Sequence, residues 1–118
     1  MQYKLLGRTG LKVSVISFGA SSLSAVFHSV DEGEAIKAVH AALDAGINYF
    51  DVAPAYGGTV SETILGKALK GISRHRYFLS TKVGKYTAPD KYGSDLLDYS
   101  EKRINQSITE STARLGTD

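Results

Sequence analysis

The strongest constraint on this chain is a strand-like segment that recurs about every 30 residues, each time followed by a helix-like segment. Strands are predicted to begin near positions 17, 47 and 77, and the helices follow from Asp31, Ser61 and Ser100. This spacing is that of a β-α-β unit, in which the strands run parallel and the helix packs outside. The sequence therefore predicts an α/β fold with about three βα units.

Each predicted helix has a start signal, one apolar face and a glycine stop. Asp31 with Glu34 three residues later resembles a capping box, and Gly46 follows that helix. Ser61 is expected to cap the second helix, and Gly71 to end it. The predicted apolar faces are Ala35, Ile36, Val39, Ala42 and Leu43; then Ile64, Leu65, Ala68 and Leu69; and, between a Ser100 cap and Gly116, Ile104, Ile108, Ser111 and Leu115.

The segments outside these units predict a β-hairpin and a long loop. The β-like runs 3–5 and 12–16 flank the turn composition of residues 7–10. Residues 83–99 are expected to form a loop, whose tyrosines (Tyr86, Tyr92 and Tyr99) either line a substrate mouth or pack the loop down. Two architectures fit: an open doubly wound sheet, or part of a (β/α)8 barrel, which takes roughly 250 residues when complete.

Composition excludes several classes of protein. Fourteen Lys and Arg against twelve Asp and Glu leave a net charge of +2, too small to indicate nucleic acid or an acidic membrane as partner. There is no cysteine, and His28, His40 and His75 show no metal-ligand spacing, so no metal site is expected. No apolar run is long enough to cross a membrane, and the N-terminus has no signal-peptide core, which predicts a cytoplasmic protein.

Candidate catalytic residues follow the predicted strands. The first strand leads into Gly19–Ser21, the second ends at Asp51 before a loop with Tyr56, and the third leads into Lys82. Because the carboxyl ends of parallel strands open onto one face, we expect Asp51, Tyr56 and Lys82 to converge at one mouth.

An acid, a phenol and an amine at one mouth suit proton transfer. A nearby ammonium favours the phenolate form of a tyrosine, so Tyr56 beside Lys82 could exchange a proton with a carbonyl oxygen near neutral pH. Asp51 would keep Lys82 charged and oriented. None of the three supplies a hydride, so such a site needs a cofactor. Each also has a structural interpretation: an Asx-turn for Asp51, a loop residue for Tyr56 and a surface ion pair for Lys82.

Several motifs together resemble the N-terminal part of the aldo-keto reductases. They are Leu6–Ser14, Phe18–Ser21, Ala45–Asp51 with Tyr56–Gly57, Ser61–Glu62, Leu65–Leu69, Ser80–Gly84 and Arg114–Asp118. The most specific part is the block G-I-N-Y-F-D, then Y-G, then S-E, within residues 46–62. Residues 19–27 are most similar to the sugar-oxidising branch of L-galactose and aldose dehydrogenases.

The resemblance implies the N-terminal portion of a (β/α)8 barrel, plugged by the hairpin, as one incomplete domain over residues 1–118. It implies interconversion of a carbonyl and an alcohol with NADP or NAD, on a small-molecule sugar or aldehyde. In that family pattern Tyr56 is the proton donor, Lys82 makes its proton easier to release, and Asp51 is the partner of Lys82. The cofactor-binding positions it implies are Gly19, Ala20, Ser21 and Asp51.

The chain departs from the family pattern in one respect. The fourth catalytic residue of the family, a histidine at the end of strand four, belongs after Asp118, and none of the three histidines here matches it. Most of the family's cofactor pocket also belongs to later elements. We therefore expect the 118-residue chain alone to be an inactive fragment. The alternative is a non-catalytic binding or regulatory barrel, like those attached to potassium channels.

Open strand edges in an incomplete barrel also predict self-association of the isolated chain. The apolar side chains expected to be exposed on the faces of such a sheet are Phe18, Tyr49, Phe50 and Phe78.

Overall fold

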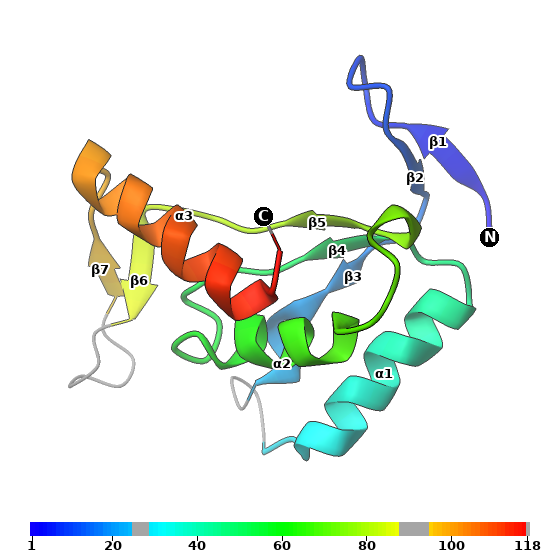
Figure 1. Ribbon diagram of the computed structural model, residues 1–118, viewed down its shortest axis with the longest axis horizontal. Helices are drawn as coiled ribbons and strands as arrows, with labels where there is room; N and C mark the ends of the chain where they lie inside the picture. The colour runs from blue at the N-terminus through cyan, green and yellow to red at the C-terminus, as the bar shows by residue number, and fades with distance from the viewer. Residues whose placement is uncertain (25–28, 88–94, 118) are drawn as a thin grey trace.

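The computed structural model describes residues 1–24, 29–87 and 95–117 of the chain (Figure 1). Its elements are β1 (Tyr3–Leu5), β2 (Lys12–Ser14), β3 (Phe18–Gly19), the 3-10 helix η1 (Ala20–Leu23), α1 (Glu32–Asp44), β4 (Tyr49–Asp51), α2 (Val60–Leu69), the 3-10 helix η2 (Arg74–Arg76), β5 (Phe78–Ser80), β6 (Lys85–Thr87), β7 (Asp95–Leu97) and α3 (Glu101–Leu115).

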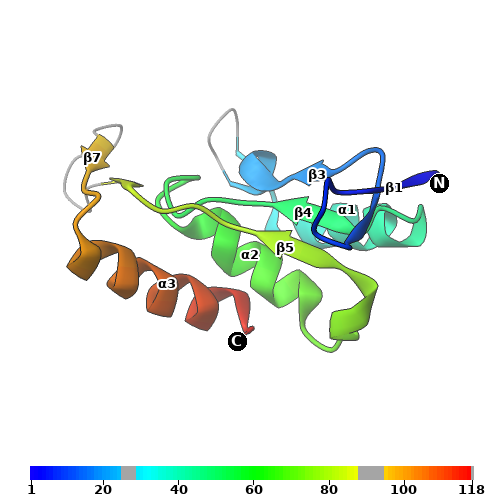
Figure 2. The same cartoon turned by 90° about the horizontal axis from the view of Figure 1, so that it is seen from above.

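The centre of the fold is a parallel sheet in the order β3-β4-β5. Each of its strands is followed by a helix, and Figure 2 shows α2 and α3 covering one face of this sheet. The alternating β-α order and the parallel pairing confirm the predicted α/β fold. Within the described residues this sheet is open, because no further strand joins β3 to β5.

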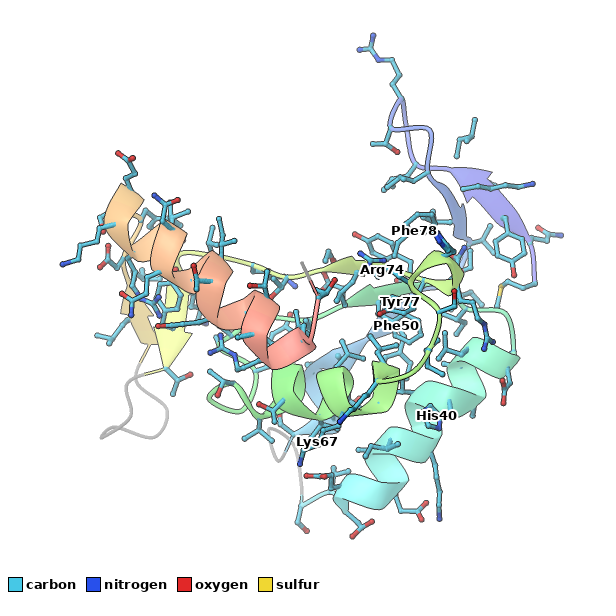
Figure 3. All side chains as sticks on the ribbon, in the orientation of Figure 1. His40, Phe50, Lys67, Arg74, Tyr77 and Phe78 are labelled. Atoms are coloured by element: carbon cyan, nitrogen blue, oxygen red, sulfur yellow. The ribbon has the colours of Figure 1, made fainter. Side chains whose placement is uncertain are left out.

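The core lies between the parallel sheet and the helices. Phe50 is fully buried, with its ring 5.5 Å from that of Phe18 and 6.4 Å from that of Tyr77 in an edge-on arrangement (Figure 3). The expectation that Phe50 is exposed was therefore wrong. Side chains alternate along a strand, so Phe50 points into the core while its neighbour Tyr49 does not. Tyr49, Phe18 and Phe78 are half-buried rather than exposed.

The ends of α1 and α3 are those predicted. The side chain of Asp31 accepts a hydrogen bond from the Glu34 amide at 3.0 Å, and that of Ser100 accepts one from the Arg103 amide. Gly116 follows α3 in the left-handed conformation, with φ of 65°.

The start of α2 differs from the prediction. Its N-cap is Thr59, in the left-handed conformation, and Ser61 lies inside the helix. Ser61 is fully buried and donates a hydrogen bond of 2.9 Å to the Ser24 hydroxyl. Gly57 and Gly58 precede it with φ of 59° and 58°, so the chain makes a left-handed turn here that a serine cap would not produce.

The apolar faces of α1 and α2 are as predicted, but that of α3 is not. Leu115 and Ser111 are buried, together with Ser107, whereas Ile108 is 50% exposed. Small side chains suit this face because α3 packs closely on α2. A Cβ atom on Gly66 of α2 would overlap the carbonyl oxygen of Arg114.

Residues 83–99 contain a second hairpin rather than only a loop. Strands β6 and β7 pair antiparallel beyond the carboxyl ends of the parallel strands (Figure 1). Tyr86 is buried and its hydroxyl accepts a 2.9 Å hydrogen bond from the Gly84 amide, while the Arg103 guanidinium stacks 3.7 Å from its ring centroid. Tyr86 thus packs the segment down, whereas Tyr99 is 66% exposed; Tyr92 lies outside the described residues.

The N-terminal hairpin, β1 with β2, forms as predicted and lies at the opposite end of the sheet from β6 and β7 (Figure 1). Asn48, just before β4, fixes it there. The Asn48 side chain accepts from the Ser14 amide at 2.7 Å and donates to the Lys12 carbonyl at 3.0 Å. The hairpin is therefore tied to the amino ends of the parallel strands, away from the candidate catalytic residues.

Candidate active site

The carboxyl ends of the three parallel strands are aligned. Gly19 at the end of β3 pairs with Asp51 at the end of β4, and Asp51 pairs with Ser80 at the end of β5. Lys82 follows β5 by two residues. Since the strands are parallel and in register, all of these residues lie at the carboxyl end of the sheet.

The Asp51 carboxylate is the central hydrogen-bond acceptor at this end of the sheet. Its Oδ1 atom lies 2.5 Å from Lys82 Nζ, and its Oδ2 atom accepts a 2.7 Å hydrogen bond from the Ser80 hydroxyl. Lys82 Nζ also donates to the main-chain carbonyl of Val52 at 3.0 Å. Both oxygens of the carboxylate are engaged, and the ammonium is held by two oxygens from β4 and the residue after it.

Tyr56 reaches the same place from the loop after β4. Lys82 Nζ lies 5.1 Å from the centroid of the Tyr56 ring, and the half-buried ring packs against the hydrophobic core. A Cβ atom on Gly57 would overlap the side chain of Ser24, so a glycine is required for the loop to pack this closely.

The charge of Lys82 is stabilised at this site. Partial burial lowers the pKa of Lys82, but the hydrogen bond and negative charge of Asp51, together with the nearby Tyr56 side chain, outweigh it and raise the pKa above the ordinary 10.5. The ammonium therefore persists at neutral pH. The pair is partly open to solvent, with 46% of the Lys82 side chain and 36% of the Asp51 side chain exposed.

The predicted convergence of Asp51, Tyr56 and Lys82 is thus what the structure shows. A cation that contacts both a carboxylate and a phenol can stabilise a phenolate, which is the property that proton transfer through a tyrosine requires.

The three residues after Phe18 have different environments. A Cβ atom on Gly19 would meet no atom within 4 Å, so the space beside Gly19 and its partner Asp51 is open. A flat ring can approach the backbone there. Ser21 is half-buried, but Ala20 is fully buried and its side chain belongs to the core. Any contact of Ala20 with a cofactor would come from its backbone.

The histidines lie elsewhere. The His40 ring, on α1, is 2.8 Å from the Ala68 carbonyl oxygen and links α1 to α2 (Figure 3). His75 is exposed in η2, and His28 is outside the described residues. Over the part of the chain that the structure describes, no group of three or more His, Asp or Glu side chains could hold a metal ion. No helix among those residues is long and apolar enough to cross a membrane.

Sequence reasoning missed one side chain that contacts this group, Ser80, and a neighbouring hydrogen bond between Thr81 and Glu62. Ser80 shares the Asp51 carboxylate with Lys82, and Thr81 donates a 2.6 Å hydrogen bond to the buried Glu62 of α2. The signal for Ser80 was its position two residues before Lys82, which places both on one face of an extended chain. The signal for Glu62 was a carboxylate among the apolar residues of α2.

Comparison with known proteins agrees with this geometry. The family model described as "Aldo/keto reductase family" matches residues 15–118. The chain belongs to the aldo-keto reductase family, and several of the relatives it matches are named as dehydrogenases.

Three relatives illustrate the range of the similarity. The chain is 46% identical to an L-galactose dehydrogenase of Arabidopsis thaliana over 100% of its own length and 35% of that protein. It is 35% identical to a D-threo-aldose 1-dehydrogenase of a Pseudomonas species, over 92% of the chain and 38% of the relative. It is also 37% identical to a probable voltage-gated potassium channel subunit beta of rice (Oryza sativa subsp. japonica), over 100% of the chain and 35% of the relative.

Among solved structures, the holo form of an aldo-keto reductase from Bacillus halodurans superposes with a TM-score of 0.88 at 36% identity. The superposition covers 100% of this chain and 37% of that one. The chain therefore spans a little over a third of the length of such relatives, which confirms that its open sheet corresponds to part of a barrel.

Proposed function

We propose that Asp51, Tyr56 and Lys82 form the proton-transfer site of an NAD(P)-dependent oxidoreductase that interconverts a carbonyl and an alcohol. The observation that carries the proposal is the contact of one ammonium, on Lys82, with both the Asp51 carboxylate at 2.5 Å and the Tyr56 side chain. Membership of the aldo-keto reductase family supplies the reaction class.

Tyr56 acts as the acid in the reducing direction. A nicotinamide cofactor, when bound beside these residues, would supply the hydride that the reaction needs. The Tyr56 hydroxyl gives its proton to the carbonyl oxygen, so that the product is a neutral alcohol. The Lys82 ammonium stabilises the phenolate that remains, and Asp51 keeps that ammonium charged and in place. In the oxidising direction the phenolate takes the proton of the substrate hydroxyl.

The residues at the strand ends fit a nicotinamide. The open space beside Gly19 admits a flat ring next to Asp51. Any other residue at position 19 would place a side chain in that space. Ser21 offers a half-buried hydroxyl, and Ala20 offers its backbone. We assign contact with the cofactor, NAD or NADP, to Gly19, Ala20, Ser21 and Asp51.

The proposed substrate is an aldose such as L-galactose. Two relatives are named for dehydrogenation of sugars, at 46% and 35% identity. The test is cofactor-dependent turnover by the full-length protein that carries these residues, assayed with L-galactose, other aldoses and simple aldehydes, each with NAD and NADP. Turnover of an aldose supports the proposal, whereas reduction of aldehydes with no sugar turned over moves the assignment to another substrate.

A regulatory role is the second candidate, because a probable potassium channel subunit beta is 37% identical to the chain. A binding or regulatory protein with this fold would turn over no carbonyl or alcohol. Cofactor binding by calorimetry without turnover of any substrate in the same panel would favour this candidate.

We further propose that the isolated 118-residue chain self-associates. Strands β3 and β5 are the edges of the parallel sheet, and exposed edges pair with other chains. The exposed apolar side chains lie mostly on the hairpins and α3, including Leu96, Leu97 and Ile108. The cytoplasmic location stays a prediction of the sequence.

A further inference from the structure

Glu62 is the one fully buried carboxylate among the described residues, and the mechanism above does not use it. It lies on α2 and is 0% exposed. Burial of a carboxylate is costly unless it is paired with a cation and hydrogen-bonded. Both of its oxygens have partners, from different parts of the chain, which indicates a specific role for the charge at this place.

The first partner of Glu62 is Arg114 of α3. Arg114 Nε donates to Glu62 Oε2 at 2.6 Å, and Arg114 Nη2 donates to Ser111 at 3.3 Å. Gly66 allows this contact, since a Cβ atom there would overlap the Arg114 carbonyl and push α3 away from α2. The ion pair therefore fixes Glu62 between two helices that pack closely.

The second partner is Thr81, whose hydroxyl donates to Glu62 Oε1 at 2.6 Å. Thr81 lies between Ser80 and Lys82, and those two neighbours both reach Asp51, at 2.7 Å and 2.5 Å. Successive side chains of an extended segment point to opposite faces. The segment is thus held on one face by Asp51 and on the other by Glu62.

We infer that Glu62, held by Arg114, is a positioning residue for Lys82, acting through the hydroxyl of Thr81. The bond from the helix layer fixes the backbone where β5 ends, which sets how far Lys82 reaches toward Asp51 and Tyr56. This inference rests on the proposed function, because it assigns Lys82 a catalytic position. Glu62, Thr81 and Arg114 touch neither substrate nor cofactor in it.

The alternative is that Glu62 only joins α2 to α3. A purely structural bond would lower stability when broken but would leave Lys82 unchanged in the molecules that remain folded. Direct observation of Lys82 separates the two, and it needs no turnover.

The test uses three variants in the full-length protein that carries these residues. Thr81→Val removes the hydroxyl at nearly constant side-chain volume, whereas Thr81→Ser keeps the hydroxyl. Thr109→Val is the matched control, because the exposed Thr109 hydroxyl bonds within its own helix, to the Asn105 carbonyl. Each variant is labelled with 15N-lysine, the Lys82 side-chain signal is assigned with Lys82→Arg, and the pKa of Lys82 is measured by titration.

The expected result is that Thr81→Val brings the pKa of Lys82 back toward the ordinary lysine value, while Thr81→Ser and Thr109→Val retain the raised pKa. With an aldose substrate, kcat of Thr81→Val falls about 10- to 100-fold, the size expected for a small misplacement of a catalytic group. KM changes less than about twofold, because ground-state binding is not affected.

An unchanged Lys82 pKa in folded Thr81→Val overturns the inference, even if kcat falls. If the wild-type protein neither oxidises an alcohol nor reduces a carbonyl, the proposed function fails, but the titration still decides the positioning. Where Thr81→Val does not fold, Thr81→Ala replaces it. Failure of both to fold while Thr81→Ser folds assigns the bond to stability alone and also overturns the inference.

Discussion

Asp51 and Lys82 are 31 residues apart in the chain, yet Lys82 Nζ lies 2.5 Å from Asp51 Oδ1. The contact follows from the topology: β4 and β5 are adjacent, parallel and in register, so the residues at their carboxyl ends must meet. One carboxylate also accepts from Ser80, which leaves it little freedom to turn. The ammonium is thereby held where it contacts the Tyr56 side chain.

Asp51→Asn tests the charge of this carboxylate. The amide keeps an acceptor for Lys82 but removes the negative charge, so the pKa of Lys82 falls and the phenolate of Tyr56 is less well stabilised. We expect kcat/KM of the full-length protein to fall roughly 10- to 100-fold. Steady-state kinetics measure the effect, with Asp44→Asn, on the exposed end of α1, as the control. Equal kinetics for the two variants would contradict an electrostatic role for Asp51.

The raised pKa of Lys82 also makes a prediction about stability. A group whose folded-state pKa is raised stabilises the fold fully below its unfolded pKa, near 10.5 here, and loses that contribution as pH rises through the folded value. Wild type should therefore be more stable than Lys82→Met at neutral pH, with the difference shrinking above this range. The effect is modest because the side chain is 46% exposed.

Urea unfolding of both proteins as a function of pH measures this difference. Lys70→Met, which changes an exposed lysine at the end of α2, controls for the titration of other lysines. A difference between wild type and Lys82→Met that does not change on passing to alkaline pH would show that the charge of Lys82 does not contribute.

Two glycines should respond differently to the same substitution. Gly66→Ala should lower the free energy of unfolding by about 1–3 kcal/mol, because the added Cβ overlaps the Arg114 backbone and neither helix can yield easily. Gly19→Ala has open space and an ordinary φ of −84°, so it should leave stability unchanged or raise it by up to about 1 kcal/mol.

The Gly19→Ala variant also tests the proposed cofactor site. If a nicotinamide lies against Gly19, Gly19→Ala should weaken cofactor binding by about tenfold or more, since an added methyl occupies the space that the ring needs. Calorimetric titration of the full-length protein with NAD and NADP measures this. Unaltered affinity in Gly19→Ala would remove Gly19 from the cofactor site.

Self-association of the isolated chain is tested by its dependence on concentration. Strands β3 and β5 present open edges, so the 118-residue chain should elute at an apparent mass that rises with concentration. Sedimentation velocity on the same samples separates dimers from larger aggregates. A single monomeric species that melts cooperatively at all concentrations would refute the prediction.

Much of the fold could be predicted because local signals and packing agreed. The parallel sheet follows from the 30-residue repeat, and the starts of α1 and α3 follow from Asp31 and Ser100. The start of α2 did not follow, because Gly57, Gly58 and Thr59 in left-handed conformations bring Ser61 inside the helix. A serine at the expected start of a helix does not indicate that such a turn precedes it.

The site could be predicted only in part. Convergence of Asp51, Tyr56 and Lys82 is a consequence of topology, which the alternation of strands and helices already indicates. The links of Ser80 and Glu62 to this group depend on which face each side chain occupies and on how closely α2 packs against α3. Those are properties of the packed structure, and no spacing in the sequence specifies them.

The most direct test of the proposed chemistry is the effect of Tyr56→Phe on turnover by the full-length protein, with cofactor affinity measured in parallel. Tyr3→Phe, which removes a hydroxyl bonded to the Gly46 carbonyl at the far end of the sheet, is the matched control. If Tyr56 transfers the proton, Tyr56→Phe should lower kcat about 10²- to 10⁴-fold and leave cofactor affinity unchanged, while Tyr3→Phe keeps wild-type turnover. Wild-type turnover by Tyr56→Phe would contradict the assignment of Tyr56 as the acid.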